Sequence, residues 1–110
     1  MAETLVYRAI ADPTRRRILD LLRKQDGMRA SDIAQQFDQI TRIAVSKHLQ
    51  TLREARLVVL ASSKDGRERI YQLNPQPLQE IQQWLRSYEE YWQQKLETLK
   101  SLAEESTEDD

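Results

Sequence analysis

Apolar residues recur at helical spacing through the first quarter of the chain and predict two short amphipathic helices. The first is indicated by four residues in i, i+4 pairs: Leu5, Val6, Ala9 and Ile10. It is expected to stop at Asp12 and Pro13, because the residue before a proline is disfavoured in a helix. Asp12 is a good N-cap and Pro13 suits the first helical position, so a second helix is predicted from Pro13 to about Gln25.

Two further helices are predicted close together after the Asp26-Gly27 turn. The third covers about 30–37 and its start lacks a good capping residue. After a tight connection at 38–40, Thr41 is a plausible N-cap for a fourth helix from Arg42 to about Ala55. Two short helices joined by about three residues predict a helix-turn-helix at about 30–55.

The pattern then changes to that of strands. Residues 57–60 are apolar and partly β-branched, and 69–73 alternate with period two around turn residues at 63–67. This predicts a β-hairpin, or wing, at about 57–73 with a basic tip. Pro75 and Pro77 end it, and a long helix is predicted at about 78–103.

Composition narrows the class of protein. The chain has 110 residues, 32% of them charged and 39% hydrophobic, so we expect one domain, no membrane span and no signal peptide. A cytoplasmic protein is therefore predicted, with residues 1–103 as the domain and 104–110 as a disordered acidic tail. Without cysteine and with His48 as the only histidine, thiolate metal sites and most catalytic constellations are excluded. We predict no enzyme, no cofactor and no metal site.

The net charge of −1 conceals a strong asymmetry. Residues 1–73 carry fourteen lysines and arginines against nine acids, net +5, whereas 74–110 carry three against nine, net −6. A basic body suits a negatively charged partner that one surface meets, with the acidic end kept away from that partner. A solvated acidic helix explains the tail equally well.

The outer face of the fourth helix carries the chemistry expected for DNA. The arc predicted to face the core contains Thr41, Val45, His48, Leu49 and Leu52, and the opposite face is short, polar and cationic. Glutamine and lysine read base edges, while arginine and hydroxyl groups bind phosphates. With the basic hairpin, the predicted DNA-binding residues are Thr41, Arg42, Ile43, Ser46, Lys47, Gln50, Arg53, Lys64, Arg67 and Arg69.

Three other features are given structural interpretations. The consecutive arginines at 15–17 point in different directions on a helix, so solvation and ion pairing are favoured over phosphate contacts. His48, on the apolar arc, is predicted to be a hydrogen-bonded packing residue. Tyr71 is predicted to pack within the hairpin or the core.

The last predicted helix has an apolar stripe at heptad-like spacing, interrupted at Lys95, where Leu96 substitutes. At about 1.5 Å per residue this helix is about 40 Å long, more than a domain of this size can cover alone. Aromatic residues on it are of the kind enriched where subunits meet. A homodimer interface is predicted from Leu5, Ala9, Leu78, Ile81, Leu85, Tyr88, Trp92, Leu96 and Leu99.

Several motifs together resemble the ArsR/SmtB-type winged-helix transcriptional repressors. They are the run from Ala11 to Leu19, the Asp32-Ile33-Ala34 and Ala44-to-Leu49 segments, and Asp65-Gly66-Arg67 before Ile70-Tyr71. The resemblance covers about Leu5 to Leu102. It implies a mainly α winged helix-turn-helix with a small β-hairpin and dimerisation helices at both ends. It also implies a homodimer whose two recognition helices enter successive major grooves of an operator.

The departures from that family concern metals and one turn. Metal-sensing members carry a Cys-Val-Cys type run at the third helix, and here Arg29 to Ile33 contains no thiol. The last helix also lacks the histidines of a second family site, so metal sensing is not carried over. Arg56 stands where glycine is usual before the wing, which predicts a less tight turn.

We therefore predict a homodimeric repressor that binds an inverted-repeat operator in double-stranded DNA, its own gene included among possible targets. As a bacterial-type regulator it would be nucleoid-associated when bound. The alternative is a winged-helix adaptor that binds protein instead of specific DNA. Retention on heparin or random DNA at low salt separates the two, since the adaptor lacks it. The sequence identifies no small-molecule inducer.

Overall fold

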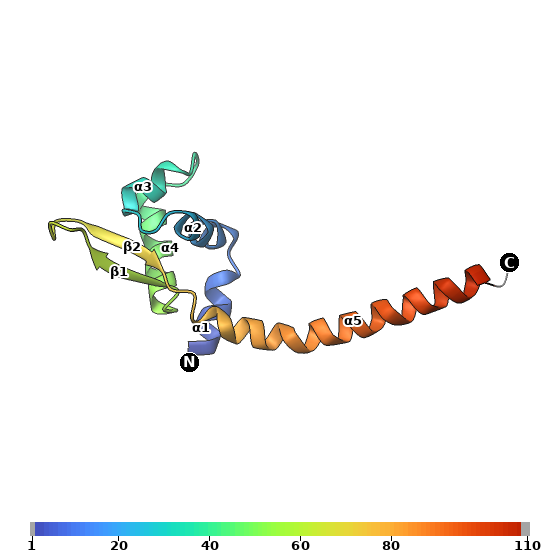
Figure 1. Cartoon of the computed structure of the whole chain (residues 1–110). Coiled ribbons are helices and arrows are strands. Elements are labelled where there is room, and N and C mark those ends of the chain that lie inside the picture. The colour runs from blue at the N-terminus through green and yellow to red at the C-terminus, as the bar shows by residue number, and fades with distance from the viewer. Residues whose placement is uncertain (1, 109–110) are drawn as a thin grey trace. The chain divides into compact units, whose positions relative to one another are not determined.

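The computed structural model describes residues 2–108, with side chains described from 5 to 106. Five helices and a two-stranded antiparallel hairpin follow one another along these described residues (Figure 1). Their bounds are α1 Ala2–Ile10, α2 Pro13–Lys24, α3 Ala30–Gln35, α4 Arg42–Glu54, β1 Val58–Ser62, β2 Arg69–Leu73 and α5 Leu78–Glu108. The fold is therefore mainly helical with one small hairpin, as predicted.

The chain divides into two compact units, 1–78 and 79–110. The second unit is a single helix, which cannot form a core by itself, so the division of the chain into domains stays a prediction. The first unit contains every buried apolar side chain that the structure describes. These are Val6, Ala9, Ile18, Leu19, Leu22, Met28, Ile33, Phe37, Val45, Leu49, Leu52, Ala55, Leu57 and Val58.

The junction between α1 and α2 is closed by arginines. Asp12 caps α2 as predicted, since its Oδ2 accepts a hydrogen bond of 3.0 Å from the Arg15 backbone N–H. The Arg15 side chain donates to the carbonyls of Ala9 and Arg8 at 2.6 and 2.8 Å, and Arg16 donates to Ile10 at 2.7 Å. Both arginines satisfy carbonyls at the end of α1, which have no partner within that helix. The prediction of ion pairing is wrong for these two residues, whose guanidinium groups bind carbonyls instead, while Arg16 remains exposed to solvent as predicted.

The turn before α3 ties the helices to the hairpin. Met28 and Tyr71 exchange two backbone hydrogen bonds of 3.0 and 2.8 Å, which extends the hairpin by one isolated bridge. Gly27 has a φ of +99°, and a Cβ there would lie 2.7 Å from Ile70 Cγ2. Glycine is therefore required by both backbone conformation and close approach. This packing places the N-terminus of α3 beside β2.

The turn from α4 into β1 is tighter than the sequence predicts. Arg56 lies in the left-handed region with a φ of 62°. Leu57 N–H donates to Leu52 carbonyl at 3.0 Å and Arg56 N–H to Arg53 carbonyl at 2.9 Å, the two bonds of a Schellman motif. The expectation of a less tight turn is wrong, because the flanking hydrogen bonds hold an arginine in the conformation that glycine usually adopts.

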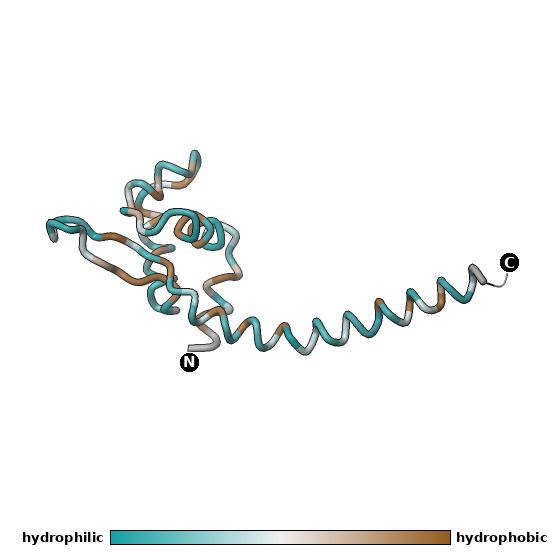
Figure 2. Tube along the Cα trace, in the orientation of Figure 1, coloured by the Kyte–Doolittle hydropathy of each residue, from teal (hydrophilic) through white to brown (hydrophobic). Residues whose placement is uncertain are grey.

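Helix α5 extends further than predicted. It continues to Glu108 rather than ending near residue 103, so the predicted disordered tail is helical over 104–108, while 109 and 110 lie outside the described residues. Three of the five residues in this stretch are glutamate, a good helix former, which explains the continuation. Apolar positions recur among polar ones along the helix, as Figure 2 shows.

Candidate nucleic-acid interface

Helix α4 is held with one face in the core and the opposite face in solvent. Thr41 Oγ1 accepts a 3.1 Å hydrogen bond from Ala44 N–H and fixes the start of the helix, as predicted. Val45, Leu49 and Leu52 are buried, so the helix cannot rotate without exposing them. The side chains predicted to read or contact DNA all face solvent: Thr41, Arg42, Ile43, Ser46, Lys47, Gln50 and Arg53.

This outer face is unusual for a solvated helix surface. From Arg42 to Arg53 the sequence contains no acidic residue. Ile43 is 71% exposed beside the polar side chains, where an apolar group has no structural role in this unit. Basic, amide, hydroxyl and apolar groups together are the side chains that contact phosphates, base edges and thymine methyl groups.

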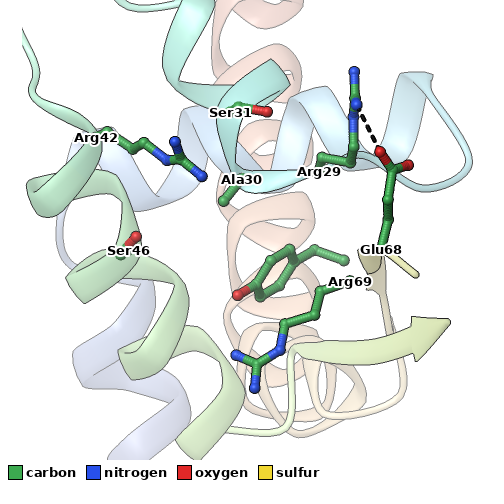
Figure 3. Close-up of a pocket in the computed structure, with 8 residues that line it drawn as sticks. Arg29, Ala30, Ser31, Arg42, Ser46, Glu68 and Arg69 are labelled. Carbon is green, nitrogen blue, oxygen red and sulfur yellow. Dashed lines mark hydrogen bonds and ion pairs between the residues drawn. The ribbon is translucent and has the colours of Figure 1, made fainter. Parts of the chain in front are cut away.

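The hairpin contributes the other basic residues, but at two different places. Arg69 begins β2 and lines a hollow together with Arg42 and Ser46 of α4 (Figure 3). Lys64 and Arg67 lie in the exposed turn between the strands, outside this hollow. The structure thus brings one of the three predicted wing residues directly opposite α4.

The wing turn is ordered by hydrogen bonds of two small polar residues, Ser63 and Asp65, that the sequence placed in a turn without predicting these bonds. Ser63 Oγ donates to Asp65 Oδ1 at 2.6 Å and accepts from Glu68 N–H at 3.1 Å. The hydrogen bond from Ser63 lowers the pKa of Asp65, which also accepts from Arg67 N–H at 3.1 Å. Serine and aspartate in a turn are a signal for such local bonds, and they hold the basic turn in one conformation.

A three-residue ion cluster joins α3 to the hairpin. Arg29 Nε lies 2.9 Å from Asp32 Oδ2, and Arg29 Nη1 lies 2.8 Å from Glu68 Oε1. Its hydrogen bonds with Asp32 and Glu68 raise the pKa of Arg29, and the guanidinium lowers the pKa of Asp32. The N-cap residue Arg29 makes no side-chain cap hydrogen bond to α3, as predicted, but Asp32 Oδ2 accepts from the Arg29 backbone N–H at 3.4 Å.

Comparison with known proteins identifies this arrangement. Residues 10–61 match the helix-turn-helix domain family. The chain is 41% identical over 83 residues to the transcriptional repressor SdpR of Bacillus subtilis, covering 76% of this chain and 88% of that protein. An ArsR-like transcriptional regulator from Rhodococcus sp. RHA1 matches with a TM-score of 0.68 and 28% identity, covering 93% of this chain and 92% of that one. The chain belongs to the ArsR family. A second ArsR family regulator matches with a TM-score of 0.70 and 26% identity, covering 84% and 98% of the two chains.

As an ArsR family member, the chain is a transcriptional regulator with a helix-turn-helix domain, and its relatives and fold are those of regulators and not of enzymes. The predicted identification as a cysteine-free winged-helix member of this family is confirmed. In the part of the chain that the structure describes, no cluster of histidine and acidic side chains could hold a metal ion. None of its described helices is long and apolar enough to cross a membrane.

The remaining predicted residues of this ArsR-type chain fall into two groups. His48 is half-buried with Nδ1 3.4 Å from Arg15 Nη1, and Tyr71 is half-buried in β2, which agrees with packing roles for both. Ala9 is fully buried, so it is a core residue and cannot contribute to a dimer interface. The other predicted interface side chains are half-buried or exposed: Leu5, Leu78, Ile81, Leu85, Tyr88, Trp92, Leu96 and Leu99.

Proposed function

We propose that this ArsR-type regulator is a homodimeric repressor that binds an inverted-repeat operator in double-stranded DNA. The observation that carries the proposal is the outer face of α4, which is acid-free and exposed while its other face is fixed in the core. Lys47 and Gln50, near the middle of this face, are assigned to base edges. The wing residues Lys64 and Arg67 are assigned to phosphates, where they add affinity without sequence preference.

SdpR, a relative of this chain, is named a transcriptional repressor, and this supports repression rather than activation as the proposed role of this chain. Exposed apolar side chains along α5 support the homodimer. Trp92 and Leu99 are both 61% exposed, and Tyr88 is 56% exposed. Such a stripe on one helix is stable in water when a second copy covers it, because the same stripe on both subunits is self-complementary. Two α4 helices would then read half-sites about one DNA turn, roughly 34 Å, apart.

The DNA-binding test starts from a duplex selected out of a random library by the full chain. Lys47→Ala and Gln50→Ala should each relax base preference by about 1–3 kcal/mol. Lys64→Ala and Arg67→Ala should weaken binding to all sequences alike and lower the salt slope by about one each. Arg23→Ala, exposed in the last turn of α2, is the matched control and should leave both properties unchanged.

Failure to enrich any duplex, together with no retention on heparin at low salt, would favour the protein-binding adaptor instead. Unchanged base preference in both α4 variants would remove this helix from readout.

The homodimer is tested separately by sedimentation at micromolar concentration. Trp92→Glu should yield a monomer that has lost operator affinity, because it places a charge in the apolar stripe. Gln94→Glu introduces the same charge on the opposite side of α5, about 200° away, and should stay dimeric. A wild-type chain that sediments as a monomer would refute the dimer and the two-half-site operator with it.

A further inference from the structure

A hollow of about 500 Å³ lies between the start of α4, the start of α3 and strand β2, entirely within residues 1–78 (Figure 3). Helix α4 contributes Arg42 and Ser46, and β2 contributes Arg69 and Tyr71. The remaining wall is formed by Ala30 and Ser31 of α3, with Arg29 and Glu68 at its edge. Three arginines and one glutamate therefore surround a polar, solvent-open space.

The three arginines are not equivalent. The guanidinium of Arg29 is turned to Glu68 and is engaged by that carboxylate and by Asp32 (Figure 3). Arg42 and Arg69 have no ion pair or side-chain hydrogen bond with any residue that the structure describes. In Figure 3 the guanidinium of Arg42 extends from α4 toward Ala30, and that of Arg69 extends from β2 toward α4.

Two guanidinium groups without an ionic partner line the same hollow, on opposite sides of it, and favour an anion there. Each offers up to five N–H donors in a planar fork that matches the oxygens of phosphate. The exposed hydroxyl of Ser46 adds a neutral donor on the same wall. A carboxylate partner is absent from this wall, because the acids nearest to the hollow are paired with Arg29.

We propose that this hollow seats a single phosphate group, held between Arg42 of α4 and Arg69 of the wing, with Ser46 as an additional donor. The proposal rests on the proposed function, in which the group is a backbone phosphate of the operator. One phosphate would then be bound by two different elements at once. This contact fixes the register of α4 and the wing on the duplex without reading sequence.

Arg29 acts here as a positioning residue and does not touch the phosphate. It neutralises Glu68, whose carboxylate would otherwise repel an anion in the same hollow. Arg29→Gln should therefore weaken DNA binding, and the double variant Arg29→Gln with Glu68→Gln should restore it. A residue that only supported folding would not be rescued by removal of the second charge.

The test uses the selected duplex with one backbone phosphate at a time replaced by a neutral methylphosphonate. In the wild type, one position in each half-site should lower affinity on the order of tenfold, since a hydrogen bond to a charged group is lost. Arg42→Gln and Arg69→Gln should both lose sensitivity at that same position and each lower the salt slope by about one. Arg23→Gln is the control and should keep the wild-type sensitivity. Thermal melts check that the exposed variants remain folded.

A second arm measures the free protein. Inorganic phosphate is titrated while the arginine Nε–H signals are followed by NMR, at constant ionic strength set with chloride. One outcome is that phosphate shifts the NMR signals only when Arg42 and Arg69 are both present, while neither variant changes the sensitivity of DNA binding to methylphosphonate. This result supports the phosphate site but assigns it to a free anion. Absence of both this NMR response and the change in methylphosphonate sensitivity overturns the proposal. If no duplex is enriched, the proposed function fails, and this arm alone still decides whether the hollow binds phosphate.

Discussion

The backbone conformation of Arg56 predicts that glycine at this position would make the folded protein more stable. Arg56 is a non-glycine residue at a φ of 62°, in the left-handed position of the turn that ends α4. A side chain in this conformation costs about 1–2 kcal/mol, because its Cβ crowds the following carbonyl. Replacement with glycine removes that cost, while the greater freedom of glycine in the unfolded chain offsets about 0.4–1 kcal/mol. Arg56→Gly should therefore stabilise the protein by about 0.5–1 kcal/mol.

The surrounding hydrogen bonds are expected to survive this change. Asn74 Nδ2 donates to the Arg56 carbonyl at 2.8 Å, and Asn74 N–H donates to the Leu57 carbonyl at 2.8 Å. All four bonds of the turn use the backbone at 56 and 57, which glycine retains. For a unit of this size the gain corresponds to a rise of about 2–8 °C in Tm.

The assay is urea unfolding of the full chain, followed by far-UV circular dichroism at one protein concentration, because dimerisation would otherwise contribute by mass action. Arg56→Ala is the matched control, since it removes the side chain but keeps the Cβ. It should lie within about 0.5 kcal/mol of the wild type. Equal stability of the glycine and alanine variants, or a loss of stability with glycine, would refute the strain at this turn.

Three further predictions concern a cap, a turn and metals. The hydrogen bond from the Arg15 N–H lowers the pKa of the Asp12 carboxyl in the folded chain. The ionised carboxylate therefore stabilises the fold fully above the unfolded pKa of about 4, and this stabilisation is lost as the pH falls through the folded pKa. The stability difference between wild type and Asp12→Asn in urea titrations should shrink accordingly below about pH 4. Gly27→Ala should destabilise by about 1–3 kcal/mol in the same assay, because its Cβ would meet Ile70 at 2.7 Å; a neutral change would show that this turn relaxes. Without thiols, operator affinity measured by fluorescence anisotropy should not respond to chelator or to micromolar zinc, cadmium or arsenite; stoichiometric release by any of these metals would contradict this.

The elements of the fold could be predicted because each depends on local signals. The Asp12-Pro13 pair and Thr41 mark helix starts by short-range hydrogen bonding, and both caps are present. Val45, Leu49 and Leu52 are buried, as their shared arc on α4 predicts, whereas Thr41, placed on the same arc, is exposed because it lies before the helix begins. The outer face of α4 could be identified for the same reason, since a residue opposite a buried stripe faces solvent.

The hollow beside α4 could not be predicted from such signals. The pair between Arg29 and Glu68 joins residues 39 positions apart, and periodicity carries no information about contacts at that separation. The carbonyl bonds of Arg15 and Arg16 were also missed, because they depend on the angle at which α1 meets α2. Ala9 was assigned to an interface from its helical spacing alone, whereas tertiary packing buries it completely.

The uneven charge of the chain explains how a protein of net charge −1 can bind DNA through one surface. The excess of five positive charges over residues 1–73 supplies the attraction, and it acts over about 10 Å at 0.1 M salt. The pairing of Arg29 with Asp32 and Glu68 adds no net positive charge to that surface, so the unpaired arginines at 42 and 69 account for the charge facing the hollow. In the proposed complex, orientation on the duplex would be set by where cations are left unpaired rather than by how many there are.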